Sequence, residues 1–360
     1  MSLRVLTVLP PREAYADGHA GAIALLVSRL AQSEDRITGK AITGRPLPGG
    51  HFVPLEISSW PLPQRLKYGI ACLAAARDFK PDLIEVHNRP DLALFLSRFA
   101  PVRLILHNDP CSMRGAKTPA QRQRLADRVL VCGVSHWVAQ RFSEGCGAMS
   151  VPIQPNCMDL EDVPEERLRQ QNVLCAGRVV ADKGVDAFVR AWGAISSRYP
   201  GWRATIMGAD RFGPDSPETP FLAQLRPIAH QAGVLMTGYQ PHTRILDAMA
   251  EAAIVVVPSR WPEPFGMTAL EAMACGAAVI VSPVGALPDV VGEAALLAAP
   301  DEPGALEGAL CRLMDQAALR SELGQKGRER AARFGLEQAR AQLLELRQQA
   351  LGFSRGSAGP

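Results

Sequence analysis

The sequence lacks most features that mark a membrane-spanning, exported or nucleic-acid-binding protein. No apolar run approaches the roughly 18 residues of a bilayer-spanning helix. Basic and acidic residues nearly balance, at 39 and 36, which argues against nucleic acid as a partner. Eight cysteines occur without a Cys-x-x-Cys pair. The opening run Leu3–Leu9 meets two prolines and indicates a strand rather than a signal peptide. We therefore expect a cytoplasmic protein whose cysteines are mostly buried and reduced.

Several catalytic signatures are missing as well. The stretch Leu9–Gly21, which follows the first apolar run, lacks the Gly-x-Gly-x-x-Gly pattern of dinucleotide-binding oxidoreductases. The chain has no Asp-x-Asp and no His-Glu-x-x-His, and its carboxylates do not recur at metal-ligand spacing. It also shows no internal repeat and no low-complexity tract. We expect neither a metal site nor nicotinamide chemistry.

What is present is the composition of an ordinary globular protein. Hydrophobic residues make up 47% and charged residues 21% of 360 positions, a length that suggests two domains. Short runs rich in Val, Ile and Leu alternate with longer helical patterns, as in a parallel sheet buried on both faces. We predict an α/β fold with strands at Leu3–Leu9, Leu83–His87, Val102–His107, Val129–Val134, Val173–Ala176, Arg203–Met207, Val234–Thr237, Ile254–Val257 and Ala278–Val281.

One charged segment divides this alternation into two halves. The segment Asp159–Asn172 carries many charges and a proline and has no strand or helix pattern. We therefore expect two Rossmann-like, doubly wound domains, at 1–160 and 161–335. Ligands of such sheets bind at the carboxyl ends of the strands, so two facing halves would form a central cleft.

Two amphipathic helices stand out in the helical patterns. The first covers the end of the chain at 336–351, and we expect it to pack back on the N-terminal domain. The second is predicted over Leu62–Phe79, where the residues on one helical stripe are Leu66, Ile70, Leu73 and Ala74.

The most informative stretch contains two glutamates, Glu263 and Glu271, separated by seven residues after a predicted strand. We expect a helix from about Met267 to Gly276, a glycine suited to end it. The preceding Gly266 lets a ligand approach the backbone, and the unpaired N–H groups of a helix start favour phosphate. Two carboxylates that flank an anion-binding turn suit a nucleotide sugar. The alternative is an acidic first turn that only stabilises its own helix.

This Glu-x7-Glu stretch resembles the retaining nucleotide-sugar glycosyltransferases of the GT4 type, a family with the GT-B fold. A second similarity lies in Cys175-Ala-Gly-Arg178 with Asp182-Lys183-Gly184, which resembles the diphosphate clamp of that family. The resemblance covers most of Val129–Gly292 and, more weakly, Leu3–Leu30. Its weaker elements are Val134-Ser135, Val151–Asp159 and the turn Thr237-Gly238-Tyr239.

The resemblance implies a role for each matching residue. Arg178 and Lys183 would bind the donor diphosphate and neutralise the leaving group, as pre-organised cations do. Glu271 would bind the ribose hydroxyls, and Glu263 would contact the donor sugar. The alternative for the two cations is a pair of surface residues in a turn. The full set of implied donor-binding residues is Arg178, Lys183, Gly238, Phe265, Gly266, Met267, Thr268, Glu271, Gly18 and Gly21.

The N-terminal half supplies further candidates. His107 ends a predicted strand where the family has a histidine that contacts the donor sugar, and it joins Glu263, Arg178 and Lys183 in the implied catalytic set. A hydrogen-bonded structural histidine is the alternative. His87 ends the preceding strand and could line the acceptor pocket. Gly18 and Gly21 stand where the family has a Gly-rich loop, although here they are not adjacent.

The expected activity is that of a retaining hexosyltransferase using a UDP- or GDP-sugar donor and needing no metal or other cofactor. By the resemblance, the acceptor would be a glycan or a lipid-linked glycan in bacterial lipopolysaccharide or surface polysaccharide synthesis. The alternatives are a nucleotide-sugar epimerase or hydrolase, and a non-catalytic scaffold of the same fold. The basic stretch Arg114–Arg128 is either a docking patch for the inner face of an anionic membrane or a solvated helix face.

Overall fold

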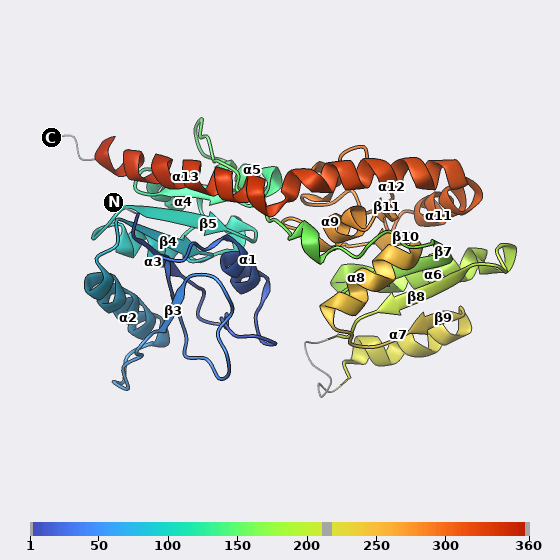
Figure 1. The fold of residues 1–360 in the computed structure, drawn as a ribbon, viewed down its shortest axis with the longest axis horizontal. Coiled ribbons are helices and arrows are strands. Elements are labelled where there is room, and N and C mark those ends of the chain that lie inside the picture. The colour runs from blue at the N-terminus through green and yellow to red at the C-terminus, as the bar shows by residue number, and fades with distance from the viewer. Residues whose placement is uncertain (1–2, 211–217, 357–360) are drawn as a thin grey trace. The chain divides into compact units, whose positions relative to one another are not determined.

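The computed structural model describes residues 3–210 and 218–356. The chain divides into two compact units (Figure 1). Unit 1 comprises Met1–Cys157 together with Leu336–Pro360, and unit 2 comprises Met158–Gly335. Each unit has its own sheet of six strands, and all recorded strand pairings within the two sheets are parallel.

Unit 1 is built on a sheet of order β3-β2-β1-β4-β5-β6. Its central strands are buried along their whole length, because helices cover both faces of the sheet. The strands are β1 (Val5–Val8), β2 (Arg36–Gly39), β3 (His51–Pro54), β4 (Leu83–His87), β5 (Val102–Leu106) and β6 (Leu130–Gly133). The helices are α1 (Ala22–Leu30), α2 (Gln64–Phe79), α3 (Pro90–Leu96), α4 (Pro119–Ala126), α5 (His136–Ser143) and α13 (Leu336–Gly356).

Unit 2 repeats this topology, with strand order β12-β11-β10-β7-β8-β9. Its strands are β7 (Gln170–Ala176), β8 (Arg203–Met207), β9 (Val234–Met236), β10 (Ala252–Val257), β11 (Ala278–Val281) and β12 (Ala295–Leu297). Its helices are α6 (Val185–Ile195), α7 (Pro220–Gln231), α8 (His242–Glu251), α9 (Met267–Ala274), α10 (Leu287–Val291), α11 (Ala305–Asp315) and α12 (Ala317–Ala331).

Both sheets are doubly wound, which confirms the predicted α/β class. In each sheet the strand order reverses between two central neighbours, β1 and β4 in unit 1 and β7 and β10 in unit 2. Loops that leave the carboxyl ends of such a pair diverge to opposite faces and leave a crevice, where ligands of this architecture bind. In unit 2 the loops after β7 and β10 carry the residues that the sequence singled out.

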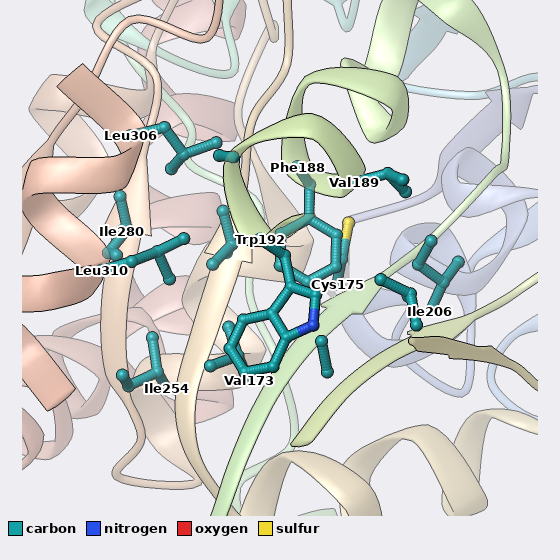
Figure 2. Packing of buried hydrophobic residues seen from close by; sticks show 14 of the residues in the cluster. Val173, Cys175, Phe188, Val189, Trp192, Ile206, Ile254, Ile280, Leu306 and Leu310 are labelled. Atoms are coloured by element: carbon teal, nitrogen blue, oxygen red, sulfur yellow. The ribbon is translucent and has the colours of Figure 1, made fainter. Parts of the chain in front are cut away.

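The core of unit 2 holds the helix that follows β7 against the sheet. Phe188 and Trp192 of α6 are buried in one cluster with Val173 of β7 and Ile254 of β10 (Figure 2). Burying large side chains of this kind contributes about 1.5–3 kcal/mol each. The packing of α6 therefore fixes the short turn at its start, Ala181–Lys183.

Three short strands were missed by the sequence analysis, namely β2, β3 and β12. Each has only three or four residues, and none forms a continuous run of Val, Ile and Leu. All three lie outside the central pair of their sheet. Strands near a sheet edge need less apolar sequence, because they are less completely covered.

Helix α2 presents its predicted apolar stripe to solvent instead of the core. Leu66 is 48% and Ile70 52% exposed, whereas Tyr68 and Cys72 are buried. The Tyr68 hydroxyl donates a hydrogen bond to the carbonyl of Leu9 at 2.6 Å, which ties the other side of the helix to the end of β1. The periodicity therefore identified a real stripe but not the direction in which it points.

Helix α13 belongs to unit 1, although it follows unit 2 in sequence. It contacts α1 and the strands β4, β5 and β6 and buries Leu343, Leu346 and Ala350. Among the helices of the described residues, none combines the length and the hydropathy that crossing a bilayer requires.

Candidate functional site

The central feature of unit 2 is an ion pair between the loops after β7 and β10. The ammonium of Lys183 contacts Oε1 of Glu263, and the same oxygen accepts a hydrogen bond from the Ser259 hydroxyl at 2.5 Å. Glu263 is only 9% exposed. The structure thus brings together two residues predicted for the site, 80 positions apart in sequence. Ser259 was not predicted, because a lone serine in a loop carries no signal.

The turn that carries Lys183 is fixed by backbone contacts to the other loop. The carbonyl of Asp182 accepts hydrogen bonds from the backbone N–H groups of Arg260 and Trp261, at 2.9 and 3.0 Å. Gly184 has φ +65°, and a Cβ there would come within 1.8 Å of the Pro258 carbonyl oxygen. Only glycine therefore permits this approach, and the backbone of the turn that carries Lys183 is fixed.

The backbone of Glu263 is held from its other side as well. Gly285 has φ +58°, and a Cβ on it would lie 2.4 Å from the nitrogen and the oxygen of Glu263. The carbonyl of Glu263 also accepts a hydrogen bond from the N–H of Ala286 at 2.8 Å. The carboxylate is therefore pre-positioned by three loops of the sheet edge.

Helix α9 begins beside this carboxylate with its N–H groups open. Gly266 precedes the helix with φ +104°, a conformation that favours glycine. Within the described residues, no acceptor contacts the backbone N–H groups of Phe265, Gly266, Met267 and Thr268. The ring of Phe265 is buried against Phe334, so this residue can offer its N–H but not its side chain. Such a helix start attracts a phosphate.

The second glutamate contacts a residue that the sequence analysis missed. Oε1 of Glu271 lies 2.9 Å from Nε2 of His242, the first residue of α8. The Glu271 side chain is 14% and the His242 side chain 51% exposed. The position of His242, four residues after Gly238, was its only sequence signal.

Glycines line the carboxyl ends of three adjacent strands, Gly177 after β7, Gly208 after β8 and Gly238 after β9. Gly208 donates to the carbonyl of Gly238 at 2.9 Å, and a Cβ on Gly208 would lie 1.9 Å from the oxygen of Gly177. This edge of the sheet therefore has a row of positions without side chains. Next to it, the exposed side chain of Arg178 makes no polar contact with the part of the chain that the structure describes.

We expect the substitution Glu271→Ala to weaken the binding of the free nucleoside diphosphate by about 10- to 150-fold, because hydrogen bonds to a charged group contribute about 1.5–3 kcal/mol. Isothermal titration calorimetry measures this affinity. The control is Glu322→Ala on the surface of α12, where the carboxylate pairs with Lys326. Unchanged affinity in a folded Glu271→Ala variant would mean that Glu271 stabilises its own helix and does not bind the nucleotide.

In unit 1 the predicted His107 is paired with His87. Nδ1 of His87 lies 2.8 Å from Nε2 of His107, and both rings are buried. The backbone N–H of His107 donates a hydrogen bond to Oδ1 of Asn88 at 2.7 Å. Burial lowers the pKa of His87 to about 4 and holds the pKa of His107 well below its ordinary value. The pair is therefore neutral at pH 7, with one ring donating to the other.

This neutral pair predicts a loss of stability in weak acid. Between pH 6.5 and about 5 the two histidines bind protons in the unfolded chain but stay neutral in the folded chain. The free energy of unfolding therefore decreases as the pH is lowered. The slope should reach about 1.4 kcal/mol per pH unit for each histidine. Urea unfolding at several pH values measures it. The variant His87→Asn should show a clearly smaller slope, and an unchanged slope would contradict the assignment.

Of the two glycines implied for donor binding in unit 1, Gly21 adjoins an acidic side chain, Glu13. Oε1 of Glu13 accepts a hydrogen bond from the N–H of Ala24 at 3.0 Å, in the first turn of α1. A Cβ on Gly21 would lie 2.4 Å from this oxygen, whereas a Cβ on Gly18, with φ +70°, would meet nothing within 4 Å. A carboxylate therefore lies at the start of α1, next to Gly21.

The basic stretch Arg114–Arg128 is not uniformly exposed. Arg122 is buried, and its guanidinium donates to the carbonyls of Ala116, Lys117, Phe142 and Glu144. This arginine holds α4 on α5 and is not available to a membrane surface.

As for metals, the described residues contain no group of three His, Cys, Asp or Glu side chains arranged to hold an ion.

A buried ionic cluster links α13 to the sheet of unit 1. Nη2 of Arg347 lies 2.7 Å from Oδ2 of Asp35 and 3.0 Å from Oε2 of Glu85. Glu85 also pairs with Arg103 at 2.7 Å, and Arg103 donates to Gln154 at 2.6 Å. The five side chains are all buried. The sequence analysis missed the cluster. A charged residue in an amphipathic helix, such as Arg347 in α13, usually lies on the solvent-exposed side, and the partners of the cluster come from separate strands and loops.

Comparison with known sequences finds a family match within unit 2. Residues 170–316 match the family described as "Glycosyl transferases group 1". A D-inositol 3-phosphate glycosyltransferase of Acidothermus cellulolyticus is 33% identical over 192 residues, 52% of this chain and 42% of that protein. The lipopolysaccharide core biosynthesis mannosyltransferase LpsB of Rhizobium meliloti is 34% identical over 173 residues, 46% of this chain and 47% of that protein. The matches span less than half of these relatives.

Comparison with solved structures extends to both units. The Anabaena protein HepE, solved in complex with UDP, superposes with a TM-score of 0.76 and 17% identity, covering 97% of this chain and 100% of that one. At this identity the likeness shows the fold alone. The chain is therefore similar to the group 1 glycosyl transferases through residues 170–316, and it has the GT-B fold.

Proposed function

We propose that the chain transfers a sugar from a nucleoside-diphosphate sugar to a hydroxyl acceptor. The observation that carries this proposal is the arrangement at the carboxyl edge of unit 2. A fixed Lys183–Glu263 pair and the open N–H groups at the start of α9 lie on adjoining loops, with Glu271 in the same helix. Cations and N–H groups suit a diphosphate, and carboxylates suit the hydroxyls of ribose and sugar.

The roles follow from the chemistry of these groups. Lys183 and Arg178 balance the charge that grows on the diphosphate as the bond from the sugar C1 breaks. The N–H groups of α9 donate to the same phosphates, and Glu271 accepts hydrogen bonds from the ribose. Glu263 holds Lys183 in place and accepts a hydrogen bond from a hydroxyl of the sugar. The acceptor oxygen then bonds to C1, and its proton passes to the departing phosphate oxygen.

We propose retention at C1, because the acceptor would attack from the face that the diphosphate leaves. A UDP- or GDP-sugar is the proposed donor, which agrees with the UDP complex of HepE. A glycan of bacterial lipopolysaccharide or surface polysaccharide is the proposed acceptor, in line with the name of the LpsB relative. His107 is buried in unit 1, and a contact from it to the sugar is part of this proposal.

A thermal-shift screen of UDP-, GDP- and ADP-sugars tests the donor class. A ligand present at 100 times its dissociation constant stabilises the folded state by about 2.7 kcal/mol. Transfer is then followed with the donor that binds, and product analysis distinguishes transfer from hydrolysis and epimerisation. A chain that binds none of these donors would contradict the proposal.

We expect transfer to continue in excess EDTA, because Lys183, Arg178 and the start of α9 supply positive charge where other transferases place a divalent ion. The measurement compares initial rates with EDTA, with Mg²⁺ and with Mn²⁺ at saturating donor. A rate that disappears with EDTA and returns with Mg²⁺ or Mn²⁺ would show that the protein groups do not suffice.

A further inference from the structure

The side chain of one arginine joins three loops at the carboxyl edge of the unit 2 sheet. Arg260 lies in the loop after β10, three residues before Glu263. Its Nη1 donates to the carbonyl of Ala181 at 2.9 Å. Nη1 and Nη2 donate to the two carboxylate oxygens of Asp186 at 2.6 and 2.9 Å. Nε and Nη2 donate to the carboxylate of Asp301 at 2.8–2.9 Å. Two carboxylates and a carbonyl therefore hold this guanidinium in one orientation.

The partners of Arg260 come from segments that are far apart in sequence. Ala181 begins the turn that carries Lys183. Asp186 lies in the first turn of α6, and Asp301 lies in the loop between β12 and α11. The backbone N–H of Arg260 donates to the turn of Lys183 as well. Arg260 therefore ties the loop after β10 to the turn of Lys183 with both its backbone and its side chain.

The guanidinium is engaged by protein groups and not left open for a ligand. Each of its three nitrogens donates to an acceptor of unit 2. Arg190, one turn further along α6, donates to Asp186 at 2.7 Å. Burial acts to raise the pKa of Asp186, but hydrogen bonds from the two arginines lower it, so the carboxylate stays charged at pH 7. With Asp301 the cluster has two cations and two carboxylates, and it does not attract the diphosphate through net charge.

We propose that Arg260 is a positioning residue that fixes the ammonium of Lys183 against Glu263 and thereby places it at the diphosphate. The inference rests on the proposed function. A cation acts on a transition state most strongly when its place is set before the reaction, and a rigid loop supplies that order. Lysine cannot take over this task, because its ammonium is a point charge, whereas the planar guanidinium reaches both carboxylates and the carbonyl at once.

Steady-state transfer by the full chain tests the proposal. The substitution Arg260→Gln should lower kcat by about 10- to 100-fold, because a misplacement of about 1 Å can cost about 100-fold. The KM for the donor should change by less than about 3-fold, since Lys183 acts on the transition state more than on the bound donor. Arg260→Lys should recover only a small part of the loss. The matched control, Arg190→Gln, removes the other cation from Asp186 and should keep kcat within about a factor of two of the parent.

A double-mutant cycle distinguishes positioning of Lys183 from a general loosening of unit 2. In the Lys183→Ala background, Arg260→Gln should lower kcat by about 2-fold at most, because the ammonium that it positions is gone. The full loss in that background would show that Arg260 does not act through Lys183, and the proposal would be overturned. A parent-like kcat in a folded Arg260→Gln variant would overturn it as well.

The reactivity of Lys183 gives a second readout that needs no transfer. Limited acylation with acetic anhydride, followed by peptide mass spectrometry, reports how freely this ammonium leaves Glu263. The exposed Lys326 is the internal reference in the same digest. Arg260→Gln should raise the acylation rate of Lys183 by about 5-fold, as for a weakened ion pair, and Arg190→Gln should not. An unchanged rate in Arg260→Gln would contradict the proposal.

A second variant covers the case in which Arg260→Gln does not fold. Asp301→Asn removes the charge of a partner whose side chain is 60% exposed, so the fold should tolerate it. A lower kcat with an unchanged donor KM and a faster acylation of Lys183 would support the proposal. Parent values of kcat and of the acylation rate would overturn it.

The outcomes separate this inference from the proposed function. Transfer by the parent together with an unchanged kcat in Arg260→Gln would retain the function and reject the inference. A parent chain that neither binds a nucleoside diphosphate nor transfers a sugar would contradict the proposed function. The acylation rates would then still decide whether Arg260 holds Lys183 on Glu263.

Discussion

We expect the substitution Lys183→Ala to lower kcat by about 100-fold or more. The ammonium faces charge that increases as the bond from C1 to the diphosphate breaks, so it stabilises the transition state more than the bound donor. Loss of one pre-organised donor of this kind typically costs 10²–10³ in kcat. The turn around Lys183 is held by Gly184 and by the carbonyl of Asp182, so the backbone should survive the substitution.

Steady-state transfer at saturating donor measures this effect. The control is Lys326→Ala, which removes a surface ammonium of α12 that pairs with Glu322. It should leave kcat within a factor of two of the parent, as surface pairs contribute little. A near-normal kcat in a folded Lys183→Ala variant would contradict the assignment of Lys183 to the phosphates.

The contact between Lys183 and Glu263 adds a test that the separate motifs did not suggest. Glu263→Gln keeps an acceptor for Ser259 but removes the charge that faces Lys183. Affinity for the free nucleoside diphosphate should then be unchanged or higher, while transfer from the intact donor falls. Because the two side chains touch, the double variant should lose less than the product of the single losses, with a coupling of about 0.5–3 kcal/mol. Loss of nucleotide binding as large as in Glu271→Ala would contradict the role of Glu263 at the sugar.

The sequence predicted the elements of the site better than the contacts between them. Lys183 and Glu263 lie in stretches with several local signals, namely a strand end, a glycine turn and a helix start. Those signals are short-range, so they can be read along the chain. The ion pair between the two residues, and the contact of Glu271 with His242, depend on strand order. No local sequence pattern encodes the order of the strands in the sheet.

The sequence did not predict which side of α2 faces the core, for a related reason. The stripe with Leu66 and Ile70 is the most hydrophobic line of α2, and periodicity alone assigns such a line to the core. The structure packs the side with Tyr68 and Cys72 instead, where small neighbours allow a close approach and the Tyr68 hydroxyl finds the Leu9 carbonyl. A helix with two apolar sides can be oriented only when its partners are known.

Removing the charge of Arg347 should have the largest effect on stability. This arginine is buried between Asp35 and Glu85, and it ties α13 to the sheet of unit 1. Burial alone would raise the pKa of Glu85, but Arg103 and Arg347 hold it well below its ordinary value. The substitution Arg347→Met keeps much of the volume. It leaves Arg103 as the partner of Glu85 and removes the cation that pairs with the buried Asp35. Breaking a buried pair in this way costs about 3–5 kcal/mol, a large share of a domain's total of about 5–15 kcal/mol.

Urea unfolding of Arg347→Met at pH 7 measures this loss, and Arg340→Ala is the control. Arg340 lies on the same helix but is exposed, and it donates a single hydrogen bond to the Arg29 carbonyl at 3.0 Å. Its replacement should cost about 1 kcal/mol or less. The pH dependence separates charge from packing. Without Arg347, burial raises the pKa of Glu85 and Asp35, so in the variant these carboxyl groups take up protons as the pH falls and no longer need a cation. The difference from the parent should therefore shrink as the pH falls. A difference that stays constant from pH 7 to pH 4 would mean that Arg347 acts through packing and not through its charge.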